Sequence, residues 1–109
     1  MDMDEQEFRR LADLALEDLH RRISALGGGE FESDFNGGAL VIEFEELPAK
    51  FVVSPNAPVK QIWVSANLKS YKLDWDPSRN VFAEAGGGLS LSGLVADAIG
   101  QQTGEKVNL

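Results

Sequence analysis

The sequence of 109 residues contains no cysteine and only one histidine. Without thiols there is no disulfide, no thiolate metal site, no cysteine nucleophile and no cysteine-ligated iron–sulfur cluster. A single histidine, with no Gly-x-Ser-x-Gly segment, leaves no nucleophilic triad to assemble. No glycine-rich phosphate loop leading into Lys-Ser/Thr is present either. We therefore expect a binding protein and not an enzyme.

Long apolar runs are also missing, and none approaches the roughly 18–20 residues that a membrane span needs. The first seven residues, Met-Asp-Met-Asp-Glu-Gln-Glu, are acidic and lack the apolar stretch of a secretory signal. Together with the absence of cysteine, these features predict a cytoplasmic protein that does not bind membranes. The length fits one domain spanning residues 1–109 and is sufficient to bury a core.

The net charge of −8 is unevenly distributed. Residues 1–46 contain thirteen acidic and four basic side chains, whereas residues 47–109 contain five acidic and six basic ones. A negative field of this kind repels nucleic acid and anionic lipid, and attracts cations or basic protein surfaces. A merely solubilising surface is the alternative interpretation.

Hydrophobic periodicity predicts the fold class. Apolar residues recur at helical spacing in residues 4–26 and 90–103, and the chain between them alternates polar and apolar residues. The predicted strands cover residues 30–35, 39–45, 50–54, 60–66, 70–75 and 81–84. Short links imply antiparallel pairing. The sequence thus predicts an α+β fold: a two-layer α/β sandwich of α-β6-α order, whose antiparallel meander sheet carries both helices on one face.

Carboxylates on the first predicted strand are spaced by two residues. Glu30, Glu32 and Asp34 should therefore project from one face, with neighbours roughly 7 Å apart. That spacing suits a row of oxygen ligands for exchangeable cations better than a closed cage. Glu43 and Glu45 add negative charge on the next strand. An ordinary solvated face is the alternative.

The first predicted helix also carries acid on its polar side. Asp13 and Glu17 are i,i+4 neighbours, and Asp18 follows directly. These carboxylates are candidate metal ligands, but pairing with nearby arginines, such as Glu17 with Arg21, is the alternative. His20 is expected on the polar face as a surface histidine.

Residues 60–65 read Lys-Gln-Ile-Trp-Val-Ser. Alternation places Ile62 and Val64 on the core face, so that Gln61 and Trp63 point outward. An exposed tryptophan in mid-strand is a candidate hot spot for binding another protein, although partial cover by adjacent strands is the alternative. We predict that Lys60, Gln61 and Trp63, together with the acidic second strand, contact a partner.

Five segments, in order along the chain, resemble the frataxin family, and specifically its bacterial CyaY-type branch. They are Glu-Phe-Arg-Arg-Leu-Ala-Asp (7–13), Asn-Gly-Gly-Ala-Leu (36–40), Pro-Val-Lys-Gln-Ile-Trp-Val-Ser (58–65), Tyr-Lys-Leu-Asp-Trp (71–75) and Gln-Gln-Thr-Gly-Glu (101–105). Each segment is short, but together they span nearly the whole chain within one α-β6-α pattern.

The resemblance implies an accessory role in iron–sulfur cluster assembly. Frataxins bind Fe²⁺ or Fe³⁺ weakly through carboxylates of the first helix and strand, and dock on a cysteine desulfurase and its scaffold protein. By motif match, the acidic positions are Asp13, Glu30, Glu32 and Asp34, and the sheet-face positions are Gln61 and Trp63. Residues 20–29, where bacterial frataxins are usually densest in acid, here contain two arginines and three glycines. We therefore expect weak iron binding.

Two other functions fit the same resemblance. The chain could be a protein-interaction module of this pathway in which metal binding is vestigial. An iron store or ferroxidase would need a preformed di-iron site, and the Glu-x-x-His motif of such sites is missing. A monomer is expected.

Overall fold

The computed structural model describes residues 3–26, 31–45, 50–86, 88–104 and 106–109. The elements are α1 (Glu5–Leu26), β1 (Phe31–Asn36), β2 (Ala39–Phe44), β3 (Lys50–Asn56), the 3₁₀ turn η1 (Ala57–Val59), β4 (Gln61–Ala66), β5 (Lys69–Asp76), β6 (Val81–Ala83) and α2 (Leu91–Thr103). None of the helices in these residues is long and apolar enough to cross a membrane.

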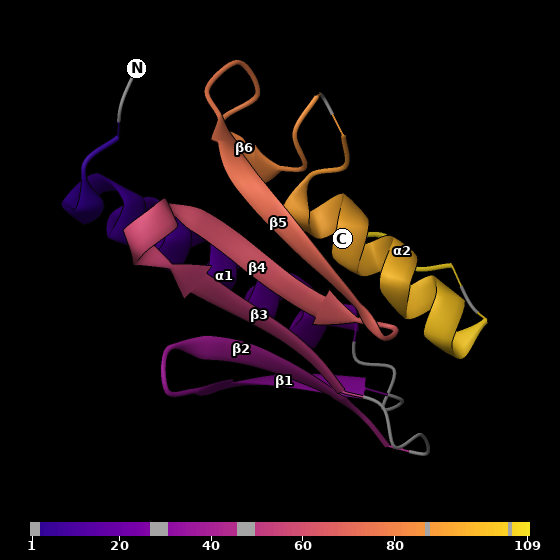
Figure 1. Ribbon diagram of the computed structural model, residues 1–109. Coiled ribbons are helices and arrows are strands. Elements are labelled where there is room, and N and C mark those ends of the chain that lie inside the picture. Colours follow the sequence, from indigo (N-terminus) through magenta and orange to yellow (C-terminus); the bar gives the residue numbers. More distant parts are fainter. Residues whose placement is uncertain (1–2, 27–30, 46–49, 87, 105) are drawn as a thin grey trace.

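The strands form one antiparallel sheet whose spatial order, β1 to β6, follows the chain. Figure 1 looks onto the open face of this sheet, with α1 lying behind the strands and α2 beside β5. Both helices belong to the same side, and the predicted two-layer α-β6-α arrangement is confirmed. No helix of the described residues covers the other face.

The core lies between the helices and the sheet. It is built from the apolar stripe of each helix and from every second residue of the strands. Its largest fully buried side chains include Phe8 of α1, Phe51 of β3, Phe82 of β6 and Ile99 of α2. Burial of this continuous apolar layer fixes which face of each strand points outward, because a shift of one residue would expose the whole set.

Local signals set the ends of the helices. Asp4 Oδ1 accepts a hydrogen bond of 2.7 Å from the Glu7 backbone N–H, which caps the start of α1. Ser90 Oγ does the same for α2, accepting from the Gly93 N–H at 3.2 Å. Gly104, at φ 78°, ends α2 in the left-handed conformation that glycine adopts readily.

Two hairpins differ in how the sequence encodes them. Gly37 and Gly38 have φ of 61° and 89°, the two positive values that a tight two-residue turn requires. The β4–β5 turn places Asn67 and Leu68 at φ 51° and 65° without any glycine. Asn67 compensates by donating from Nδ2 to the Ala98 carbonyl oxygen at 3.2 Å, which ties the turn to α2.

The third strand is longer than predicted. Its predicted end was Ser54, but β3 continues through Pro55 to Asn56, which pairs with Gln61. Beyond Val53, β3 pairs only with β4, so a residue without an N–H is tolerated there. Lys60 then lies outside β4, at φ 54° after η1, where the strand had been predicted to begin.

The β5–β6 turn holds an unusually acidic carboxyl group. The Ser78 hydroxyl and the Arg79 guanidinium hydrogen-bond the Asp76 carboxylate at 2.6 and 2.8 Å. These bonds lower the pKa of Asp76 from 3.8 to about 2, with the Ser78 hydroxyl making the largest contribution. Since the folded-state pKa is depressed, the stabilisation is present above the unfolded-state value and is lost as pH falls from about 4 to about 2.

Replacing Asp76→Asn should therefore lower the free energy of unfolding at neutral pH and flatten its decline between about pH 4 and pH 2. Urea unfolding across that range measures both effects. As a control, Ser78→Ala removes the hydroxyl that lowers the pKa of Asp76 most and should give an intermediate curve. Identical pH profiles for all three proteins would contradict this account of the turn.

Candidate functional site

The carboxylates of β1 point to the open face of the sheet. Phe31 and Ser33 are half-buried on the helix side, whereas Glu32 and Asp34 alternate with them and are exposed. Asp34 Oδ1 also accepts a hydrogen bond from the Phe35 backbone N–H at 2.9 Å. Glu30, the third carboxylate of the predicted row, lies outside the described residues.

Glu32 comes together with the acidic residues of β2. It pairs directly with Glu43 across the β1–β2 ladder, and both line a hollow together with Glu45 and, from α1, Ile23 and Ser24. Like charges directly opposite on two strands are unfavourable unless something positive lies between or above them. Lys50 on β3 is the register partner of Glu43 on its other side. The sequence had assigned these three glutamates to two separate roles, and the structure places them in one hollow.

The candidate acidic ligands of α1 differ in whether an arginine already pairs with them. Asp13 and Glu17 are exposed and form no ion pair within the described residues. The Asp18 carboxylate forms ion pairs with both following arginines: its Oδ1 lies 2.6 Å from Arg21 Nη2, and its Oδ2 lies 2.8 Å from Arg22 Nε. The suggested Glu17–Arg21 pair is therefore wrong, because the Arg21 side chain turns to Asp18 three residues before it. A cation at Asp18 would have to displace two guanidinium groups.

A contact between α1 and β1 separates the two groups of carboxylates. The His20 ring packs edge-on against Phe35, with centroids 5.2 Å apart, and His20 Nδ1 lies 2.6 Å from Ser33 Oγ. His20 was expected on the surface, but it is half-buried in this seam. Since Ser33 and Phe35 face the helix, Glu32 and Asp34 face away from it. Within the described ranges, no three His, Asp or Glu side chains gather closely enough to hold a metal ion.

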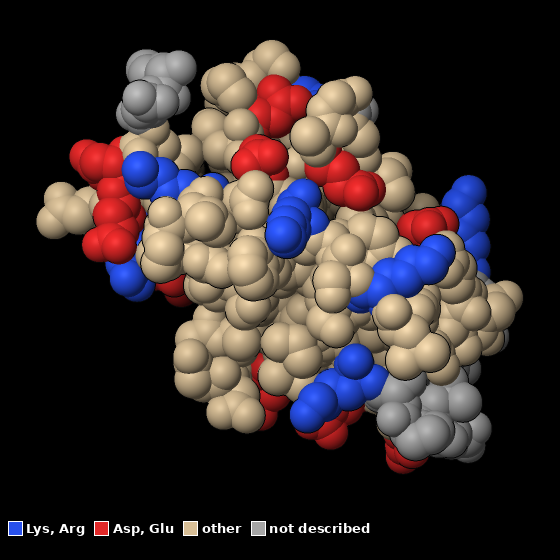
Figure 2. All heavy atoms as spheres, viewed as in Figure 1, with Lys and Arg blue, Asp and Glu red and all other residues tan. Residues whose placement is uncertain are grey.

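The open face carries Trp63 near its middle. Ile62 and Val64 are buried at 0% and 1% exposure, whereas Trp63 is 38% exposed, as the alternation predicted. Gln61 lies on the same side of β4, and Lys72 is the register partner of Trp63 on β5. In Figure 2 this face is a broad uncharged area crossed by separate basic side chains, with most acidic atoms toward its margins.

Two residues of this face were missed by the sequence reasoning. Lys72 Nζ lies 5.1 Å from the centroid of the Trp63 ring, and Asp74 Oδ1 accepts from Gln61 Nε2 at 3.1 Å. Their spacing of two along β5 was a usable signal for a shared face, but their contacts depend on the β4–β5 register. Lys60, by contrast, directly precedes the first residue of β4. There it lines a groove together with Asp74 of β5.

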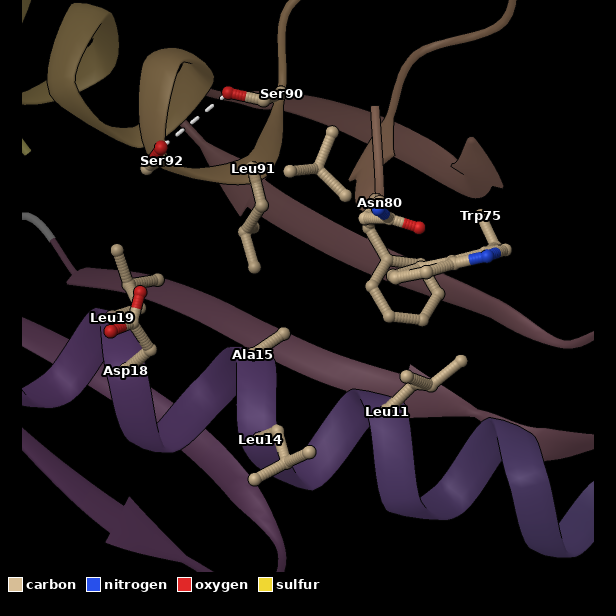
Figure 3. A pocket seen from close by; sticks show the side chains of 12 residues that line it. Leu11, Leu14, Ala15, Asp18, Leu19, Trp75, Asn80, Ser90, Leu91 and Ser92 are labelled. Carbon is tan, nitrogen blue, oxygen red and sulfur yellow. Dashed lines mark hydrogen bonds between the residues drawn. The ribbon is translucent and has the colours of Figure 1, made fainter. Parts of the chain in front are cut away.

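The helix side contains a separate cavity of about 280 Å³ between α1, the β5–β6 end of the sheet and the start of α2. Figure 3 shows Leu11 and Leu14 of α1 below this space, with Trp75 at one end and Leu91 above. Its lining is mostly apolar, and Asp18 is the one carboxylate among the described residues that line it. The exposed carboxylates and Trp63 thus belong to other surfaces than this cavity.

The comparison with known protein families agrees with this architecture. Residues 1–105 match a family model described as the frataxin-like domain. The chain belongs to the frataxin family. A relative from Tolumonas auensis (strain DSM 9187 / NBRC 110442 / TA 4), named iron-sulfur cluster assembly protein CyaY, is 30% identical over 80 residues. That alignment covers 73% of this chain and 74% of the relative, which makes this a bacterial CyaY-type frataxin.

A solved structure shows the same fold. The frataxin from Psychromonas ingrahamii, described as belonging to the CyaY protein family, superposes on this frataxin with a TM-score of 0.84. The superposition covers 97% of each chain at 24% sequence identity. At that identity the likeness establishes the fold alone.

Proposed function

We propose that this chain is a non-enzymatic accessory protein of iron–sulfur cluster assembly in the bacterial cytoplasm. In this role it docks on a cysteine desulfurase and its scaffold protein, and it binds Fe²⁺ or Fe³⁺ weakly. Membership of the frataxin family and the name of the CyaY relative support the pathway. The concentration of acid in the first half of the chain supports a basic docking partner.

The observation that carries the docking proposal is the hollow lined by Glu32, Glu43 and Glu45. Two of these carboxylates face each other directly across the β1–β2 ladder. A lysine or arginine of a partner placed between them would relieve their repulsion and form charge-assisted hydrogen bonds. Exposed complementary charges accelerate association, and salt screens them. Docking should therefore weaken as ionic strength rises.

The iron proposal rests on the same oxygen-rich surface. Carboxylates are hard ligands suited to iron, and Asp13, Glu17, Glu32 and Asp34 are all exposed. The described carboxylates do not converge in a group of three, so an ion would be held by few protein ligands and would keep much of its water. Such contacts are weak and exchangeable, which fits transient rather than stored iron.

A charge reversal tests the docking proposal. Glu32→Lys should weaken binding to the cognate desulfurase–scaffold complex about tenfold at low salt, because it places a positive group where a basic partner is expected. The matched control is Asp97→Lys, which changes net charge equally on the exposed side of α2. Calorimetric titration at low and moderate salt measures both. Equal affinities for the two variants would overturn the acidic docking surface.

A second function has its own support. If metal binding is vestigial, the chain acts purely as an interaction module of the same pathway. The engagement of Asp18 by Arg21 and Arg22 favours this alternative, since it removes one of the predicted helix ligands. The Trp63 face, and not the carboxylates, would then dominate binding.

A further inference from the structure

The indole N–H of Trp63 is held by a chain of hydrogen bonds. Trp63 Nε1 donates to Gln61 Oε1 at 3.0 Å, and Gln61 Nε2 donates to Asp74 Oδ1 at 3.1 Å. An indole N–H can only donate and an ionised carboxylate can only accept. The Gln61 amide therefore has one orientation that satisfies both neighbours, with its NH₂ toward Asp74 and its oxygen toward Trp63.

We infer that Asp74 is a positioning residue, which acts through Gln61 to fix the Trp63 ring for docking. Asp74 accepts a hydrogen bond from the Gln61 amide, and that amide accepts one from the ring. Its carboxylate selects the amide orientation, and the amide oxygen then holds one edge of the indole. The inference rests on the proposed function, because it concerns how the sheet face meets the assembly complex.

Lys72 contacts the flat face of the Trp63 ring, whereas Gln61 holds its edge. Its Nζ lies 5.1 Å from the ring centroid, within the range of a cation–π contact. Gln61 and Trp63 are two apart on β4, as Lys72 and Asp74 are on β5, so two neighbouring strands supply all four side chains. The sheet register, rather than long flexible loops, determines their distances.

The fixed ring forms one wall of a hollow of about 300 Å³. Small residues lie around it: Ser54, Ser65 and Ser70 are among the lining residues, together with Val52. A wall already held in place reduces the entropy lost on binding, and rigid tryptophans in such places are frequent hot spots.

The free protein provides the first test. Asp74→Ala should release the Gln61 amide and speed hydrogen exchange of the Trp63 indole N–H, observed by ¹H–¹⁵N NMR. Asp74→Asn should restore slow exchange, because the asparagine carbonyl can still accept from Gln61. The matched control is Asp97→Ala, which removes a carboxylate that accepts from the Gln101 amide at 2.9 Å on α2. Unchanged indole exchange in Asp74→Ala would overturn the positioning role.

Binding provides the second test. Asp74→Ala should weaken docking on the desulfurase–scaffold complex about fivefold, and Asp74→Asn should recover most of the loss. In a Trp63→Ala background the same Asp74 change should have no further effect, as expected if it acts through the ring. Full affinity of Asp74→Ala, or an undiminished effect without Trp63, would overturn the inference. Failure of the unchanged protein to bind would overturn the proposed function instead, and indole exchange would still decide the positioning role.

Discussion

Replacement of Phe82 by alanine should lower the free energy of unfolding by about 3–5 kcal/mol. Phe82 is 1% exposed and packs edge-on against Phe8 of α1 at 5.8 Å and against Trp75 of β5 at 5.2 Å. It therefore joins the first helix to the far edge of the sheet through a strand of only three residues. Since small domains are stable by about 5–15 kcal/mol, this loss is a large part of the total. Urea unfolding monitored by circular dichroism measures it.

Phe35→Ala is the matched control for this prediction. It removes the same side chain from a position that is 42% exposed, where the ring contacts His20. The expected loss is below about 1 kcal/mol, because little apolar surface is returned to water. Losses of equal size at the two positions would contradict the view that Phe82 links the layers of the core.

Trp63→Ala should weaken docking on the desulfurase–scaffold complex about thirtyfold, the effect of losing a hot-spot aromatic. The folded state should be little affected, because the ring is 38% exposed on the open face. Calorimetric titration measures the affinity, and thermal unfolding checks the fold. Compared with Glu32→Lys, the result also separates the two proposed functions, since in a pure interaction module Trp63→Ala should still weaken docking whereas Glu32→Lys should have almost no effect.

Leu14→Ala is a suitable control, because it removes another exposed apolar side chain, at 52% exposure, from α1. It should leave docking unchanged. If Trp63→Ala bound as tightly as the unaltered protein while Glu32→Lys did not, Trp63 would have no part in docking.

Much of the fold was predictable because local and global signals agree. The apolar periodicity of α1 and α2 and the alternation in the strands each mark the face that the core buries. Glycines 37 and 38 encode the first hairpin directly. The extension of β3 through Pro55 was not predictable from turn-forming residues, since it depends on which neighbour the strand still has. The Asn67–Leu68 turn likewise depends on a contact with α2.

The candidate site was predictable only where alternation alone decides the outcome. The outward direction of Trp63 and Gln61 follows from the burial of Ile62 and Val64. The link from Gln61 to Asp74 joins residues thirteen positions apart, so it required the register of two strands. The choice of Arg21 between two acidic neighbours on α1 was also beyond a spacing argument, since both lie within reach.

The two helices that cover the sheet come from opposite ends of the chain, although the sheet itself is assembled from consecutive neighbours. A nascent chain can therefore pair its strands in the order of synthesis, but it cannot close its core before α2 has left the ribosome. Until then, the core side chains of the sheet lack the cover that α2 provides. Synthesis of this protein thus passes through a stage with exposed apolar surface, of the kind that favours aggregation, and that stage ends only when α2 can pack.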